Sequence, residues 1–95
     1  MTKSEIRQGD LVLSKSGRDK GQVFLVVSKC GQTVYLVDGK VRKINAQKKK
    51  NVKHLEKFSN VSYNELAMKI DNGEAVGNKR IYLLIRAEKQ KIQED

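Results

Sequence analysis

The chain has few of the residues that commonly stabilise small proteins or equip them with chemistry. Among 95 residues there is one cysteine, one histidine, no tryptophan and only five aromatic side chains. One cysteine excludes an intrachain disulfide, and one cysteine with one histidine is too small a ligand set for a structural zinc site. A Walker phosphate-binding motif is also absent. We therefore expect no metal, no cofactor and no small-molecule substrate.

A catalytic pair is equally hard to assemble. Cys30 and His54 are the only candidates for a nucleophile with a histidine base, and no third group is evident that would orient the base or stabilise an oxyanion. The sequence therefore predicts a protein that is not an enzyme.

Long apolar segments are missing as well. No run of 18 or more apolar residues occurs, although a helix that crosses a membrane needs about that length. The first nine residues have no apolar stretch of the kind found in a signal peptide. We expect a cytoplasmic protein that does not interact with membranes.

Acidic residues are scarce in only one part of the chain. The sequence has 20 Lys and Arg against 11 Asp and Glu, a net charge of +9. Residues 1–58 hold 14 basic and 5 acidic side chains, whereas residues 59–95 hold 6 of each. Charge concentrated in one module is typical of a protein that binds a polyanion. We therefore divide the chain into a basic domain, 1–58, and an extension, 59–95.

The basic domain has the pattern of a small β structure. Five short apolar segments, rich in β-branched residues and bounded by turn signals, predict strands at 11–13, 23–27, 34–37, 41–44 and 52–55. Asp38-Gly39 suits a two-residue type I′ turn and predicts a hairpin of strands 33–37 and 40–45. Five strands in so short a segment favour a small barrel, because a barrel hides most strand edges.

The extension changes to a helical period. Tyr63, Leu66, Ala67 and Ile70 lie on one face of a helix, Ser62 with Glu65 could form a capping box, and Asn72-Gly73 is a plausible stop. A second helix is predicted from Asn78, although the apolar run 81–85 is also compatible with a buried strand. The predicted fold class is mainly β, a five-stranded barrel with a C-terminal helical appendage.

A glycine-bracketed loop between the first two predicted strands is the first candidate binding element. Gly17 and Gly21 permit positive φ, and Lys15, Arg18 and Lys20 concentrate charge beside them. Fixed cations and accessible backbone N–H groups both favour phosphate oxygens. The loop is therefore predicted to contact a phosphate backbone.

The segment around this loop resembles the KOW motif of RNA-binding and ribosomal proteins. The resemblance covers residues 9–39 and is carried by Gly9-Asp10-x-Val12, by Gly17-x-x-Lys20-Gly21 and by the valine-rich strand that follows. It is most similar to the branch that contains an archaeal and eukaryotic large-subunit ribosomal protein and its small bacterial relatives. That resemblance implies a barrel of the SH3 type that contacts ribosomal RNA, with Lys20 and Gly21 in the family's Lys-Gly loop.

The second candidate element is a basic segment without acidic residues. Between residues 40 and 53 it contains seven cations: Lys40, Arg42, Lys43, Lys48, Lys49, Lys50 and Lys53. Their mutual repulsion would cost stability unless an anion relieved it. We predict that these cations bind RNA together with the cations and glycines of the first loop. Tyr35 could stack on a base, but core packing is the simpler interpretation.

The leading hypothesis is therefore a non-catalytic protein that binds structured RNA, with ribosomal RNA and possibly ribosomal proteins as partners. Few aromatics are available to read unpaired bases, so phosphate and shape should dominate recognition. The alternative is a protein-interaction module of transcription or translation, in which the apolar stripes of the two C-terminal helices dock a partner.

Overall fold

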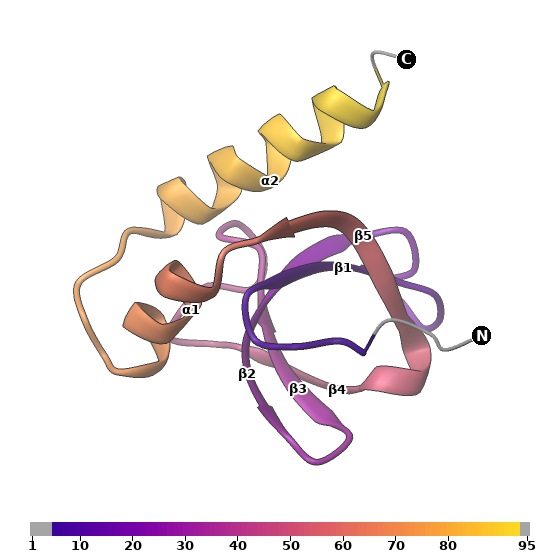
Figure 1. Cartoon of the computed structure of the whole chain (residues 1–95), viewed down its shortest axis with the longest axis horizontal. Coiled ribbons are helices and arrows are strands. Elements are labelled where there is room, and N and C mark those ends of the chain that lie inside the picture. The colour runs from indigo at the N-terminus through magenta and orange to yellow at the C-terminus, as the bar shows by residue number, and fades with distance from the viewer. Residues whose placement is uncertain (1–4, 94–95) are drawn as a thin grey trace.

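The fold combines an antiparallel sheet with two helices (Figure 1). A computed structural model describes residues 5–93, so residues 1–4 of the predicted basic domain and 94–95 of the extension lie outside it. The elements are β1 (Asp10–Ser14), β2 (Val23–Cys30), β3 (Thr33–Val37), β4 (Lys48–Asn51), the 3₁₀ turn η1 (Val52–His54), β5 (Leu55–Ser62), α1 (Asn64–Asp71) and α2 (Asn78–Gln93). No helix in this part of the chain is both long and apolar enough to span a membrane.

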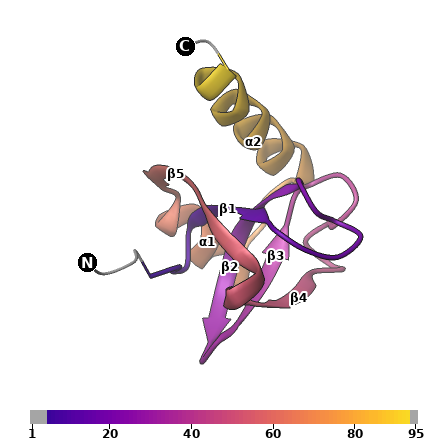
Figure 2. The same cartoon turned by 90° about the vertical axis from the view of Figure 1, so that its right-hand side faces the viewer.

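The five strands form one sheet in the order β4-β3-β2-β1-β5, with antiparallel neighbours throughout. The prediction of a mainly β, five-stranded fold with a helical extension is confirmed. The sheet is strongly curved in Figures 1 and 2, and the single turn η1 carries the chain from β4 at one edge to β5 at the other. Within residues 5–93 these two edge strands do not pair, so the sheet is open.

Both faces of β2 are buried, which explains its uninterrupted apolar run. Val23, Leu25 and Val27 face a core that also contains residues of α1 and α2. Phe24 and Val26 face a second core, which contains Ile6 near the N-terminal end, Val12 of β1, Val34 and Leu36 of β3, and Leu55 of β5. Successive strand residues point to opposite faces, so one continuous apolar strand supplies both cores.

The predicted hairpin at Asp38-Gly39 is wrong. Gly39 has a φ of 81°, but Asp38 does not adopt the positive φ that a type I′ turn requires. Instead, the Asp38 Oδ1 atom accepts hydrogen bonds from the N–H groups of Lys40 (2.9 Å) and Arg42 (2.8 Å). This local bonding holds residues 38–47 in a loop, and the strand predicted at 41–44 does not form.

The strand predicted at 52–55 is also wrong for most of its length. The Asn51 side chain accepts a hydrogen bond from the N–H of Lys53 and caps the turn η1, which occupies Val52–His54. The fifth strand begins only at Leu55 and continues past residue 58 to Ser62. The fourth strand is the lysine-rich segment Lys48–Asn51, which pairs with β3.

Both predicted helices form, and each buries its apolar stripe against the sheet. Leu66, Ala67 and Ile70 of α1 are buried, as are Ile81 and Ile85 of α2. The predicted capping box does not form. The N-cap residue is Tyr63, without a side-chain cap, and its N–H donates to the Gly9 carbonyl (2.8 Å).

Helix α2 is attached at two positions along its length. At its first residue, the Asn78 Oδ1 atom accepts a hydrogen bond from the N–H of Ile44 in the 38–47 loop (2.8 Å). In the second half of the helix, the buried carboxylate of Glu88 accepts a 2.6 Å hydrogen bond from the Tyr63 hydroxyl. Burial raises the pKa of Tyr63 to about 12, and the Glu88 carboxylate adds to the rise. These contacts fix α2 relative to the loop and to the start of α1.

We predict that Gly39→Ala destabilises the fold by about 2 to 4 kcal/mol. A Cβ at this position would lie against the Asn78 carbonyl oxygen and 2.7 Å from the Tyr82 nitrogen, in a backbone with positive φ. Gly31→Ala is the matched control, since Gly31 also has positive φ but a Cβ there would meet nothing within 4 Å. It should cost about 1 kcal/mol. Urea unfolding measures both, and equal costs would contradict close packing of α2 on the loop.

Candidate nucleic-acid interface

The loop between β1 and β2 has the backbone shape that its glycines predict. Gly17 has a φ of 85° and Gly21 a φ of 90°. The Gly21 N–H donates to the Ser14 carbonyl (2.9 Å), and the Lys20 N–H donates to the Gly17 carbonyl (3.2 Å). Within residues 5–93, the N–H groups of Gly17 and Arg18 donate no hydrogen bond. The backbone N–H donors available to a ligand are therefore at the tip of the loop. Gly21 is bonded to Ser14, where the loop leaves β1.

Asp19 ties this loop to β4. Its Oδ1 atom accepts hydrogen bonds from the Ser14 hydroxyl (2.8 Å) and the Lys50 ammonium (2.7 Å), and the Lys48 ammonium lies 3.3 Å from Oδ2. Lys50 also donates to the Ser16 carbonyl (2.9 Å). Two of the seven cations in the basic segment therefore have an acidic partner from elsewhere in the chain, and Lys50 holds the loop in place.

The contacts of Asp19 lower the pKa of its carboxyl group. Burial by itself would raise its pKa, but hydrogen bonds from Lys50 and Ser14 and the nearby ammonium of Lys48 outweigh that effect and lower the pKa to about 2, from 3.8. Asp19 is consequently ionised at neutral pH, and its charge is compensated inside the protein.

The two predicted binding elements meet at one depression, which we call the basic cleft. Its volume is about 320 Å³, and it is lined by Arg18, Asp19, Gln22, Phe24, Asp38, Val41, Arg42 and Lys48. Arg18 comes from the first loop, whereas Arg42 and Lys48 come from the basic segment. Both acidic residues in the lining are bonded internally, Asp19 to lysines and Asp38 to backbone N–H groups. Lys48 is one of the partners of Asp19, so Arg18 and Arg42 are the lining cations that form no ion pair within residues 5–93.

The other predicted site residues lie outside the basic cleft. Lys15 and Lys53 line a separate depression of about 310 Å³ with Lys29 and Glu5. Lys40 and Lys43 line another, of about 370 Å³, beside the N-terminal turn of α2. Lys20 and Lys49 are exposed. The structure therefore brings together part of the predicted set and spreads the rest over neighbouring surfaces.

Three residues beside the predicted site come from α2 and were not expected there. Tyr82, Arg86 and Lys89 line a depression of about 560 Å³ that also contains Lys40 and Val41; we call it the α2 cleft. Basic and acidic residues balance in 59–95, so net charge gave no reason to select them. Their spacing of four and three residues, which places them on one helix face, is the signal that could have found them.

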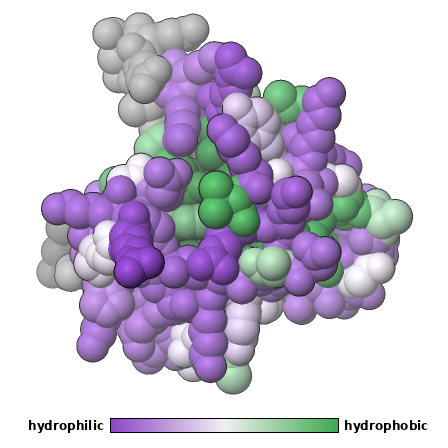
Figure 3. Space-filling model, turned by 180° about the vertical axis from the view of Figure 1, so that it is seen from behind, coloured by the Kyte–Doolittle hydropathy of each residue, from purple (hydrophilic) through white to green (hydrophobic). Residues whose placement is uncertain are grey.

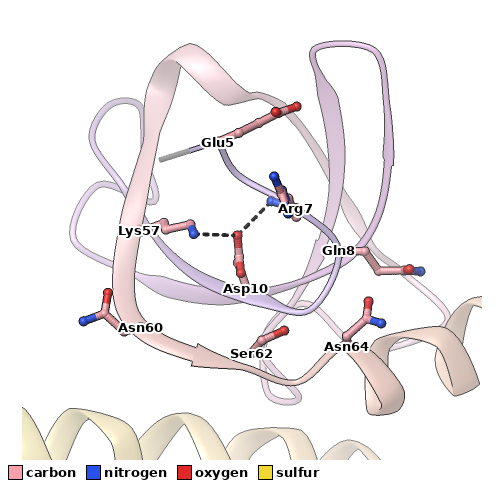
Figure 4. A pocket seen from close by; sticks show the side chains of 8 residues that line it. All are labelled: Glu5, Arg7, Gln8, Asp10, Lys57, Asn60, Ser62 and Asn64. Carbon is pink, nitrogen blue, oxygen red and sulfur yellow. Dashed lines mark hydrogen bonds and ion pairs between the residues drawn. The ribbon is translucent and has the colours of Figure 1, made fainter. Parts of the chain in front are cut away.

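A further depression, of about 630 Å³, is shown in Figure 4 and is less suited to a polyanion. At its centre the Asp10 carboxylate accepts a hydrogen bond from the Arg7 N–H (2.8 Å) and lies 3.7 Å from the Lys57 ammonium (Figure 4). The rest of its lining is formed by Glu5, Gln8, Asn60, Ser62 and Asn64. Charges of both signs are present there and partly pair with each other.

Gly9 and Asp10, the first residues of the KOW-like motif, support the fold. A Cβ on Gly9 would lie 2.5 Å from the backbone of Asn64, so only glycine allows β1 to approach the start of α1 so closely. Among the described residues, no group of three His, Cys, Asp or Glu is placed to hold a metal ion. Cys30 is exposed at the end of β2, and His54 lies in η1.

Comparison with protein-family models and with curated proteins finds no match to this chain. The functional argument therefore depends on the residues and their geometry.

We predict that Asp19→Asn lowers the free energy of unfolding at pH 7 by about 2 kcal/mol. The pKa of Asp19 is lower in the folded chain than its ordinary 3.8, so its carboxylate stabilises the fold above about pH 4. That contribution is lost as the pH falls toward 2. The difference between parent and variant, measured by urea unfolding, should therefore shrink to about 0.5 kcal/mol near pH 2. A difference independent of pH would show that the carboxylate charge does not anchor the loop.

Proposed function

We propose that this protein is a non-catalytic RNA-binding protein that holds the phosphate backbone of structured RNA in the basic cleft. Ribosomal RNA, in the cytoplasm, is the proposed partner, in keeping with the resemblance of residues 9–39 to the KOW motif. Ribosomal proteins on the same particle are proposed as further partners. The remaining exposed cations, such as Lys20 and Lys49, would add contacts around the cleft.

One observation carries the proposal: Arg18 and Arg42, from two separate loops, line one cleft, and the two acidic side chains beside them are already bonded, Asp19 to lysines and Asp38 to backbone N–H groups. Arg18 lies on the β1–β2 loop, and Arg42 lies on the loop between β3 and β4. Guanidinium groups present planar forks of donors that match phosphate oxygens. A cleft lined by two such groups is suited to a phosphate backbone.

The content of the cleft favours recognition of backbone and shape. Phe24 is the aromatic residue in its lining, and at 2% exposure its ring is not available to stack on a base. Phosphate contacts position a protein on a nucleic acid without reading the sequence. We therefore expect structured RNAs of similar shape to bind with similar affinity.

An SH3-type barrel is the fold that we propose for the sheet. Three features support it: the strand order, the single turn η1 between the two edge strands, and a separate core enclosed by the curved sheet. In this interpretation, the glycine loop between β1 and β2 corresponds to the Lys-Gly loop of the KOW motif that the sequence resembles.

The protein-interaction alternative has less support. Its basis was the apolar stripe on each C-terminal helix, and Leu66, Ile70, Ile81 and Ile85 are all buried against the sheet. On the face shown in Figure 3, hydrophilic side chains cover most of the surface, and hydrophobic ones are open in a small central area and toward the right-hand edge. RNA is therefore the partner that we favour.

The test is a polarisation titration with an RNA hairpin at several salt concentrations. If the protein neutralises about 4 to 6 phosphates, log K against log salt should have a slope of about −3 to −5. Arg18→Ala with Arg42→Ala should weaken binding at least about tenfold and reduce the slope by about 2. Arg18→Lys should restore only part of the loss if that contact is bidentate.

The matched control is Lys69→Ala with Arg80→Ala, which removes the same charge from exposed positions on α1 and α2 outside both clefts. It should lower affinity only slightly. Equal losses in the two double variants would mean that net charge binds RNA without a site. A slope near zero for the parent would contradict RNA binding by phosphate contacts.

A further inference from the structure

The basic cleft and the α2 cleft adjoin each other along one surface. Gln22, Asp38 and Val41 line both of them. Val41 is 75% exposed. Burial of this apolar side chain against a ligand would be favourable. An isolated apolar side chain between two basic depressions is well placed to lie against the sugar or base of a bound nucleotide.

The α2 cleft is also positively charged. Lys40, Arg86 and Lys89 contribute cations, and the acidic residue in its lining is Asp38, which accepts hydrogen bonds from backbone N–H groups. Glu88 precedes Lys89 on α2 but is buried, and its carboxylate accepts from the Tyr63 hydroxyl and from Lys91 (3.2 Å). The cations of the second cleft therefore extend the charge of the first.

Tyr82 provides the α2 cleft with an accessible aromatic ring, which the basic cleft lacks. Its ring is partly exposed and lines both the α2 cleft and the neighbouring depression that contains Lys43 and Lys79. The Lys40 ammonium lies 5.8 Å from the ring centroid. Surfaces that bind single-stranded nucleic acid combine cations for the backbone with aromatic rings for the bases, and Tyr82 with its basic neighbours has that composition.

Helix α2 holds this surface in a fixed position. Ile81 and Ile85, which flank Tyr82 on the helix, are buried in the core, and Asn78 is bonded to the loop that carries Lys40 and Val41. Little ordering of the protein is then needed when a ligand binds, which favours affinity.

From this juxtaposition we propose that the α2 cleft binds an unpaired nucleotide segment adjoining the RNA helix that is held in the basic cleft. Tyr82 stacks on one base, and Lys40, Arg86 and Lys89 contact the phosphates of the unpaired strand. The inference rests on the proposed function and goes beyond it, because it makes the preferred ligand a junction between paired and unpaired RNA.

The experiment compares two RNA hairpins of about ten base pairs, one blunt and one with an unpaired overhang of about four nucleotides. Polarisation titrations measure the affinity of the parent protein for each. The overhang, on the 5′ or the 3′ side, should raise affinity about tenfold, the gain expected from stacking one base and adding phosphate contacts.

Variants assign that gain to residues. Tyr82→Leu should abolish the overhang advantage and leave affinity for the blunt hairpin unchanged, whereas Tyr82→Phe should keep the advantage. Arg86→Gln with Lys89→Gln should reduce the salt slope by about 1 to 2 for the overhang RNA only. Lys69→Gln with Arg80→Gln is the control of equal charge, and thermal unfolding checks that each variant is folded.

The outcomes separate this inference from the proposed function. If the parent binds the blunt hairpin as tightly as the hairpins with a 5′ or a 3′ overhang, the inference is overturned and the proposed function stands. An overhang advantage that survives both Tyr82→Leu and the Arg86 and Lys89 substitutions also overturns it. Failure of the parent to bind either RNA overturns both proposals.

Discussion

The carboxylate of Asp19 joins two segments that are distant in sequence and that together form the basic cleft. It accepts hydrogen bonds from Ser14 and Lys50, and its second oxygen lies beside Lys48. Without this negative charge, β4 would place two lysine ammonium groups beside a loop that already carries Arg18. The resulting repulsion would oppose the approach of the two segments. One internal anion thus allows the protein to concentrate cations on a single surface and still fold.

The same arrangement gives the cations of the basic segment different roles. Lys50 is almost completely buried beside Asp19, with 9% of its side chain exposed, so its charge is compensated within the protein. Arg42 and Val41 project from a loop that Asp38 and helix α2 hold in shape. A charged run that looks uniform in the sequence therefore contains cations that stabilise the fold and cations that are free to face a ligand. Removing the whole run in one experiment would not separate an effect on stability from an effect on binding.

Local patterns predicted the elements that depend on local physics. The apolar run 23–27, the helical stripe ending at Ile70 and the positive φ of Gly17 and Gly21 are all present. Contacts between distant residues decided the rest. Three consecutive lysines have no strand pattern, yet Lys48–Asn51 is a strand because it pairs with β3 and reaches Asp19. The place of α2 beside the basic cleft depends on packing around Gly39, which no periodicity reveals.

The central claim is that this protein binds RNA in its cellular setting. Sedimentation of a cell lysate through a sucrose gradient is the most direct test of that claim. At low salt, the parent protein should migrate with large ribosomal particles, and RNase treatment or high salt should release it to the top of the gradient. The variant without Arg18 and Arg42 should remain at the top at low salt. Migration of the parent as a free protein under every condition would contradict the account.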